Sequence, residues 1–245
     1  MKKIFFICFT LLLALTGGCS MNDKQNQNGQ DGEKTEAVKP KDMDPKDLPQ
    51  VPAFQDKKTR EYMVSAKEEE PGYYLLESKL KGFRMLFPED GEYDDYLSSK
   101  SINEEIISFY SYDKNTNIQF NGKTEYYRHQ SFINDPDEAL EQVRKDNSYK
   151  GNFERSEDND KDMYFAYMKR VYDDIDSKYN STHSYIGYIK SKRESNVGIE
   201  FTFDFTCQKG DQPCSLNKED IQKKAKKIVN SITFLKGKKE SQDGK

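Results

Sequence analysis

A strict alternation of large apolar and polar residues over positions 197–206 constrains the fold of this chain more than any other feature. The odd positions carry apolar side chains: Val197, Ile199, Phe201, Phe203 and Phe205. The even positions are small or polar, and Glu200 and Asp204 are among them. Successive side chains of a β-strand point to opposite faces of a sheet, so this segment is predicted to be a strand with one face in a core and the other in water.

Similar alternation recurs in shorter runs, which we predict to be strands. These runs lie at 73–79, 83–87, 107–110, 118–126, 163–168, 185–189 and 232–235. Both sets of alternating side chains are largely apolar over 163–168, which predicts a strand covered on both faces.

Two segments have the spacing of amphipathic helices. One begins near Pro136 with a buried stripe through Leu140 and Val143, and the other begins near Asn217 with a stripe through Ile221 and Ile228. Runs of strands joined by short turns favour antiparallel pairing. We therefore expect an α+β fold, a mostly antiparallel β-sheet flanked by two helices.

The first residues resemble a bacterial lipoprotein signal. Two lysines precede the apolar run Ile4–Leu15, which is shorter than the ~20 residues that a membrane-spanning helix needs. The run ends in Leu15-Thr16-Gly17-Gly18-Cys19, which is similar to the lipobox. That resemblance implies a signal peptide over residues 1–18, cleavage before Cys19, and a diacylglyceryl group carrying acyl chains such as palmitate on its thiol. An ordinary secretory signal with a chance cysteine is the alternative.

Composition divides the rest of the chain into three parts. Residues 19–70 are dominated by polar and charged side chains, and we expect the lipidated cysteine to be followed by a disordered linker there. A short helix is predicted within 52–66, where Phe54, Tyr62 and Met63 occur. Residues 71–236 are predicted to form the α+β domain, and residues 237–245 a flexible tail.

Cys207 and Cys214 are candidates for a disulfide. Six residues separate them, including Gly210 and Pro213, which favour a turn. Outside the cytoplasm such a pair oxidises readily, and closing so small a loop contributes about 2–3 kcal/mol by the chain-entropy estimate. Two free thiols or a redox pair are the alternatives, although no Cys-x-x-Cys motif is present.

Few residues of the chain are suited to catalysis or metal binding. His129 and His183 are its only imidazoles and are predicted to lie at strand ends, and no Gly-x-Ser-x-Gly, His-Glu-x-x-His or P-loop motif occurs. The acidic cluster 158–162 lacks the glycine and glutamate of a calcium loop, and 173–176 is another acidic turn. Both are interpreted as solvated hairpin tips, with weak calcium binding as the alternative. We expect no metal, no cofactor and no enzymatic activity.

The charge balance argues against nucleic acid as a partner. The chain has 39 Lys+Arg against 43 Asp+Glu, a net charge of −4, without the basic excess that nucleic-acid binding requires. No polybasic lipid-binding segment is evident either. Tyrosines on the predicted strands, such as Tyr110 and Tyr112, suit binding of peptides or glycans but also simply satisfy strand propensity.

Two short motifs resemble the Mog1/PsbP-like domain over roughly residues 72–236. The N-terminal strand of that domain resembles Gly82-Phe83-Arg84-Met85-Leu86-Phe87-Pro88. Its C-terminal helix and strand resemble the predicted helix that contains Ala225 and continues into Ser231-Ile232-Thr233-Phe234. With the lipobox, the whole chain is similar to lipoproteins of Bacillus-type bacteria. The resemblance implies a binding or assembly module and carries no common catalytic residues.

These observations lead to one functional expectation and two alternatives. We expect a non-catalytic protein that a lipid anchors to the extracytoplasmic face of the cell membrane. It would act with an envelope protein partner as an interaction or assembly module, in surface or multicellular behaviour such as colony or biofilm architecture. The alternatives are a solute-binding lipoprotein of a transporter and an envelope hydrolase that uses His129 or His183.

Overall fold

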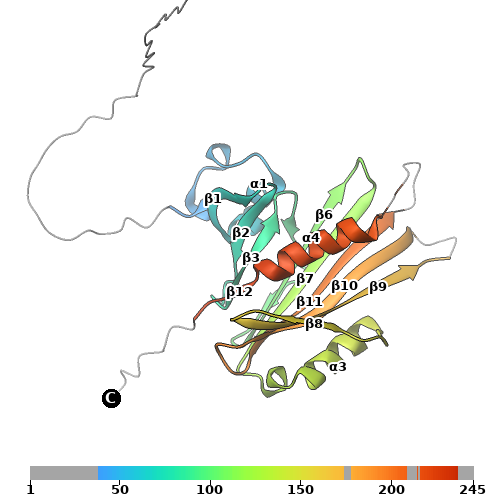
Figure 1. The fold of residues 1–245 in the computed structure, drawn as a ribbon. Coiled ribbons are helices and arrows are strands. Elements are labelled where there is room, and N and C mark those ends of the chain that lie inside the picture. Colours follow the sequence, from blue (N-terminus) through green and yellow to red (C-terminus); the bar gives the residue numbers. More distant parts are fainter. Residues whose placement is uncertain (1–37, 174–177, 209–213, 215, 237–245) are drawn as a thin grey trace, which may run out of the picture. The chain divides into compact units, whose positions relative to one another are not determined.

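The computed structural model describes residues 38–173, 178–208, 214 and 216–236, which form two antiparallel β-sheets with helices against them (Figure 1). The smaller sheet has the order β1 (Met63–Glu70), β2 (Tyr73–Glu77), β3 (Phe83–Pro88), β12 (Thr233–Phe234). The larger sheet has the order β4 (Glu92–Tyr93), β6 (Glu104–Asp113), β7 (Ile118–Arg128), β11 (Val197–Gln208), β10 (Tyr179–Ser191), β9 (Lys161–Val171), β8 (Glu154–Glu157), with β5 (Ser99–Lys100) also paired to β6. The predicted α+β class with a mostly antiparallel sheet is confirmed.

Two long helices flank the larger sheet, as the sequence predicts. These are α3 (Pro136–Asn147) and α4 (Lys218–Ser231). The side chain of Asp135 accepts a hydrogen bond from the first turn of α3, and that of Asn217 does the same for α4, so each begins at a capped residue. Short helices complete the described part: α1 (Pro52–Gln55), α2 (Lys57–Arg60) and the 3₁₀ turns η1 (Pro40–Asp42), η2 (Pro45–Asp47) and η3 (Ser131–Asn134). Within the described residues, no helix combines the length and apolarity needed to cross a membrane.

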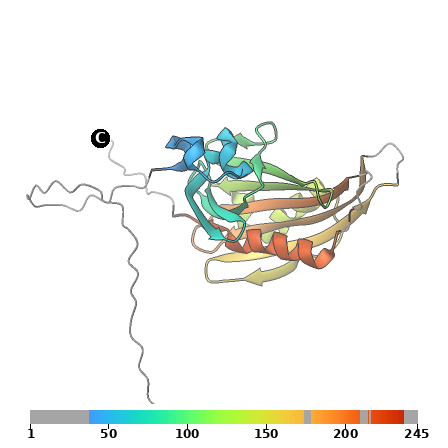
Figure 2. The same ribbon diagram turned by 90° about the horizontal axis from the view of Figure 1, so that it is seen from above.

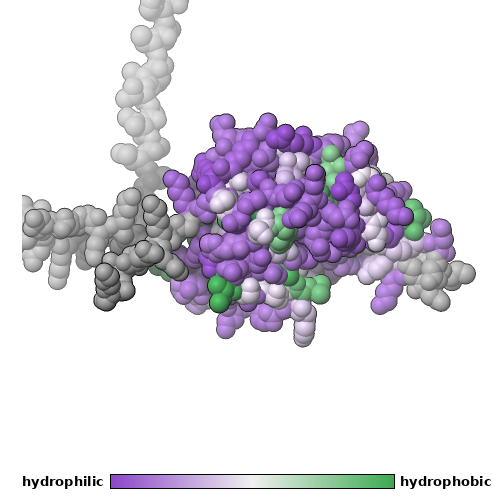
Figure 3. Space-filling view, turned by 90° about the horizontal axis from the view of Figure 1, so that it is seen from below, coloured by the Kyte–Doolittle hydropathy of each residue, from purple (hydrophilic) through white to green (hydrophobic). Residues whose placement is uncertain are grey.

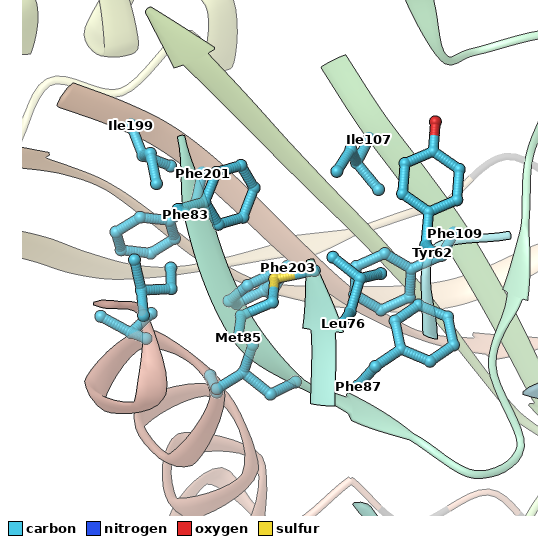
Figure 4. Close-up of a cluster of buried hydrophobic side chains, with 14 of the residues drawn as sticks. Tyr62, Leu76, Phe83, Met85, Phe87, Ile107, Phe109, Ile199, Phe201 and Phe203 are labelled. Atoms are coloured by element: carbon cyan, nitrogen blue, oxygen red, sulfur yellow. The ribbon is translucent and has the colours of Figure 1, made fainter. Parts of the chain in front are cut away.

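An aromatic core fills the space between the larger sheet and a layer made of the smaller sheet and α4 (Figures 1, 2 and 4). Phe120 of β7 and Phe205 of β11 stack with their ring centroids 4.5 Å apart, and Phe109 of β6 lies 4.9 Å from Phe87 of β3. Gly122 makes room for Phe109, because a Cβ at position 122 would lie 2.2 Å from that ring. The alternating apolar residues of 197–206 all face this core.

Helix α3 covers part of the opposite face of the larger sheet. Its Leu140 and Val143 pack with Ile186 and Tyr188 of β10 and with Ala166 of β9. Strand β9 is therefore covered on both faces, as its sequence predicts. The prediction that the even positions of 197–206 lie in water is wrong in part, because this cover leaves Glu200 only 6% exposed. The face of the domain shown in Figure 3 is mainly hydrophilic, and its hydrophobic spots are small and separate.

The folded part begins earlier than the boundary at residue 71 that composition indicates. Residues 38–70 contain η1, η2, α1, α2 and β1, and Leu48, Phe54 and Tyr62 are buried in the main core. The buried Arg60 guanidinium also donates to the carbonyl oxygen of Phe54 at 2.9 Å. A few well-spaced apolar side chains are enough to fix this polar segment, because the rest of the domain supplies the surface that they cover. The predicted signal peptide 1–18, Cys19, and the tail 237–245 lie outside the described residues.

Cys207, at the end of β11, lies at disulfide distance from Cys214, in the segment that precedes α4. Their Cα atoms are 5.7 Å apart. A bond between the two sulfur atoms ties the last helix to the sheet on which it packs. The disulfide in the native protein stays a prediction.

Lys161 fixes the other end of α4. Its side chain is buried, and its ammonium group donates to the carbonyl oxygens of Asn230 at 2.7 Å and of Ile232 at 2.6 Å. The last carbonyl groups of a helix have no partner within the helix and carry its negative end. A cation from β9 therefore completes α4 and joins it to the sheet.

We expect Lys161→Met to lower the free energy of unfolding by about 3 kcal/mol, because the carbonyl groups at the end of α4 lose a buried donor. Urea unfolding monitored by circular dichroism measures the change. Lys169→Met, on an exposed position of the same strand, is the matched control and should change stability little. Equal losses in the two variants would contradict the capping role.

Candidate functional site

The part of the larger sheet that α3 leaves uncovered forms a cleft of about 430 Å³. Its floor comes from β6, β7 and β11, and its walls from the C-terminal half of α3 and the loop that follows β4. We call it the acidic cleft, because five carboxyl groups and one ammonium group line it: Asp94, Glu125, Asp146, Glu200, Asp204 and Lys123.

Two of these carboxyl groups lie directly opposite each other. Glu200 of β11 pairs with Glu125 of β7 in the antiparallel register. Side chains in such positions have Cβ atoms roughly 4.5–5.5 Å apart, and like charges there repel. The core imposes this pairing, because the same register aligns the phenylalanines on the other face.

The two carboxyl groups differ in their surroundings. The Glu125 carboxylate lies 2.6 Å from the ammonium of Lys123 and accepts a hydrogen bond from the hydroxyl of Tyr127. The buried Oε1 of Glu200 has no hydrogen-bond partner in the described part of the chain. Burial, and then the nearby carboxylates of Glu125 and Asp146, raise the pKa of Glu200 to about 8. Glu200 therefore holds a proton at neutral pH.

The rest of the cleft adds charge and an apolar rim. Burial raises the pKa of Asp204, and the opposing effects of Ser184 and Arg170 are smaller. Asp94 shapes the rim by accepting hydrogen bonds from the backbone N–H groups of Tyr96 at 3.0 Å and Leu97 at 3.1 Å. The side chain of Leu97, which lines the cleft, is 68% exposed, and that of the neighbouring Tyr96 is 98% exposed. Exposed apolar side chains beside a charged cleft are typical of binding sites for other molecules.

The cleft suits binding of a positively charged group more than covalent chemistry. No histidine or cysteine is among the described residues that line it, and the hydroxyl of Ser108 donates to the backbone oxygen of Leu97. Nowhere in the described ranges do three His, Cys, Asp or Glu side chains come together as a metal site would need. A cationic side chain entering the cleft would meet ionised carboxylates and the unpartnered oxygen of Glu200.

The two histidines do not form a site together. His183 lies inside β10 and is buried, which corrects the expectation of a strand-end position; its Nδ1 is 2.8 Å from the Tyr167 hydroxyl. Burial, and then the charge of Lys169, lowers the pKa of His183. His129 is exposed just beyond the end of β7. Strand pairing puts His183 level with position 120 of β7, so the two imidazoles are roughly 30 Å apart along the sheet at ~3.3 Å per residue.

The carboxylates of the first acidic cluster, 158–162, interact with other groups of the protein itself. Asp160 pairs with Arg193 at 2.5 Å and Asp162 pairs with Arg155 at 2.8 Å, while Asp158 accepts hydrogen bonds from backbone N–H groups. These carboxylates are therefore engaged in the β8–β9 hairpin. In the second acidic cluster, positions 174–176 lie outside the described residues.

Most of the strand tyrosines are structural. Tyr126, Tyr185 and Tyr188 are buried, which favours the reading of these residues as strand formers. Tyr110 and Tyr112 are partly exposed, and their hydroxyl groups donate to Glu92 and Asn117.

The sequence did not reveal the acidic cleft, because the pairing of Glu125 with Glu200 depends on a register between strands about 75 residues apart.

The whole chain resembles known proteins. It matches the model of the family described as "Putative lipoprotein YvcA" over residues 49–233. It is 61% identical over 241 residues to the Bacillus subtilis (strain 168) protein of that name, covering 98% of this chain and 100% of that protein. These matches confirm the resemblance to lipoproteins of Bacillus-type bacteria.

Among solved structures, the crystal structure of the Saccharomyces cerevisiae Ran-binding protein Mog1p is similar, with a TM-score of 0.40 and 5% sequence identity. That similarity covers 66% of this chain and 94% of Mog1p. The similarity is too slight to support a conclusion about this chain.

The raised pKa of Glu200 predicts a stability that falls as pH rises. Between the ordinary value of 4.5 and about 8, the folded protein holds a proton that the unfolded chain has released. The stabilisation is therefore complete below pH 4.5 and is lost as pH rises through 8. We expect a loss of a few kcal/mol across this window, at about 1.4 kcal/mol per pKa unit.

Glu200→Gln should remove most of this pH dependence and make the protein more stable than the wild type at pH 8. Urea unfolding at several pH values measures both effects. Glu138→Gln, on an exposed position of α3, is the control and should keep the wild-type profile. A Glu200→Gln profile that parallels the wild type would contradict the buried, protonated state.

Proposed function

The chain belongs to the family described as putative lipoprotein YvcA, and on that premise we propose that it is a lipid-anchored, non-catalytic interaction module of the cell envelope. The observation that carries the proposal is the acidic cleft with its exposed apolar rim. The lipid holds the domain at the membrane, and the cleft binds a partner there.

Two observations support the anchoring. The relative that is 61% identical along its full length is named a lipoprotein, and Cys19 of this chain follows the small residues Gly17 and Gly18 at the end of an apolar run. A diacylglyceryl group supplies two acyl chains, and two such chains are enough for stable membrane anchoring. Cys207 and Cys214 at disulfide distance agree with an oxidising, extracytoplasmic location.

The partner of the cleft is a basic segment of another envelope protein. Its Lys or Arg side chain enters among the carboxylates, and an apolar residue beside that cation packs on Leu97 of the rim. Charge complementarity of this kind gives orientation and a fast encounter more than high affinity. Such a contact fits an assembly role in surface or multicellular behaviour, including colony or biofilm architecture.

The structure supports the two alternative functions less well. A solute-binding lipoprotein of a transporter encloses its ligand, whereas this cleft is a groove open at the surface of one sheet. Neither His129 nor His183 lines the cleft, so the structure does not support a hydrolase that uses one of them there.

Acid–base chemistry at Glu125 and Glu200 is the second candidate function. Two facing carboxyl groups in different surroundings, one of them with a raised pKa, are the arrangement that general acid and base pairs share. Loss of a hydrolytic activity on envelope glycans in Glu200→Gln would assign this function in place of binding alone.

Cys19→Ala should abolish incorporation of a labelled palmitate analogue and leave the signal peptide attached, because the thiol that carries the lipid is absent. Metabolic labelling and intact mass measure the two effects. Ser20→Ala, at the adjacent position, should remain lipidated and processed. A wild-type protein that takes up no label and keeps residues 1–18 would contradict the anchoring.

Leu97→Ser combined with Asp146→Lys should remove the partner from the cleft, because the pair deletes an apolar rim contact and reverses one charge. In-cell crosslinking followed by mass spectrometry should show at least a tenfold loss of the main crosslinked protein. Val171→Ser combined with Glu154→Lys changes the same kinds of exposed side chain elsewhere and should retain it. Equal crosslinking in both variants would exclude the cleft as the binding site.

A further inference from the structure

A second pocket, of about 500 Å³, lies where the described part of the chain begins. Seven cationic side chains and two carboxylates surround it, and we call it the basic pocket. The cationic residues are Lys39, Lys41, Lys57, Lys79, Lys81, Arg84 and Lys100, and the acidic residues are Glu61 and Glu77.

The fold assembles this charge from separate segments. Among the cationic residues, Lys39 and Lys41 come from the η1 region, Lys57 from α2 and Lys100 from β5. Lys79 and Lys81 lie in the turn between β2 and β3, and Arg84 lies in β3. No run of basic residues marks the pocket in the sequence. The chain as a whole is acidic, with a net charge of −4, so the pocket is a local reversal of sign.

The carboxylates of the basic pocket are already engaged. Glu61 pairs with Lys79 at 2.7 Å, and Glu77 pairs with Arg84 at 2.5 Å and with Lys81. The Lys79 ammonium also lies 4.4 Å from the centre of the Tyr62 ring. These contacts hold one wall of the pocket in place.

Four lysines of the pocket remain without a carboxylate partner. Within the described ranges, no ion pair includes Lys39, Lys41, Lys57 or Lys100. Their ammonium groups are exposed around one cavity, where they repel one another and attract an anion. A phosphate group matches this site, because lysine binds phosphate as a compact point charge.

We propose that the basic pocket binds the phosphodiester headgroup of an anionic lipid in the membrane that anchors the chain. The proposal rests on the lipid anchoring proposed above. It adds a second contact with the same membrane: the acyl chains of Cys19 hold the chain to the bilayer, and the pocket holds the domain against its surface. The acidic cleft lies elsewhere on the domain and stays available for a partner.

The position of the pocket in the chain favours lipid over a free phosphate ester. Lys39 follows Cys19 by twenty residues, and even fully extended a chain of that length spans no more than about 70 Å. This covalent limit keeps the pocket within reach of the bilayer and raises the effective concentration of headgroups around it. Juxtamembrane lysines attract anionic lipid once they lie within roughly 10 Å of the bilayer surface, since screening removes the attraction farther away.

Vesicle cosedimentation tests the proposal with the unlipidated chain from Ser20 to Lys245, which contains every described residue. We expect binding to vesicles of phosphatidylglycerol mixed with phosphatidylcholine and none to phosphatidylcholine alone. Replacing Lys39, Lys41, Lys57 and Lys100 by Gln should weaken this binding at least tenfold. This assay omits the lipid on Cys19, so it tests the pocket independently of the anchoring. Absence of vesicle binding would leave the proposed lipidation of Cys19 untouched, and absence of lipidation would leave binding at the pocket untouched.

A matched variant separates the pocket from overall charge. Replacing Lys114, Lys150, Lys178 and Lys223 by Gln removes the same number of exposed charges outside the pocket. That variant should bind within twofold of the wild type, and circular dichroism should show both variants folded. Equal losses in the two variants, or no binding of the wild type to anionic vesicles, would overturn the proposal.

Two further results would assign the pocket to another occupant. Glycerol phosphate in solution that binds as tightly as the anionic vesicles would identify a free phosphate ester and overturn the lipid. Self-association of the chain without vesicles, lost when the four pocket lysines are replaced, would identify the acidic cleft of a second copy as the occupant of the pocket. That result would also overturn the lipid proposal.

Discussion

The aromatic core between the two sheets is the constraint on which the rest of this structure depends. Rings from β6 and β11 meet rings from β3 in one continuous cluster (Figure 4), to which β7 adds Phe120 and Tyr126. A slip of one residue between β7 and β11 would turn the rings of one of these two strands to the wrong face. The core therefore fixes the register, and the register places Glu125 opposite Glu200 on the far side. The acidic cleft is in this sense the reverse face of the core.

The cleft costs stability. An unpartnered buried carboxyl group is unfavourable, and Glu200 reduces the cost by holding a proton. A longer α3 or an apolar side chain at position 200 would cover this face of the sheet with a smaller loss of stability. The open, acidic groove is thus not a requirement of folding, which agrees with the binding role proposed for it.

The domain separates its charges into two sites. The acidic cleft lies on the face of the larger sheet that α3 partly covers, and the basic pocket lies where the chain enters the domain. The net charge reveals neither site, because a value of −4 is the small difference between 39 basic and 43 acidic residues. Under the proposed function this separation is useful, since attraction to the bilayer at the pocket would leave the cleft free to bind a partner.

The sequence by itself determined the long strands of the core, the two long helices and the α+β class, because periods of 2 and 3.6 residues are local properties of the chain. It missed β1, β4, β5 and β8, which carry no such clear alternation. It placed β11 and the covered strand β9 correctly, and its resemblance to lipoproteins of Bacillus-type bacteria was confirmed. Only the tertiary structure decided that residues 38–70 belong to the domain, that His183 is buried, and that the two charged sites exist. Each of these depends on contacts between residues far apart in the chain, which no local pattern encodes.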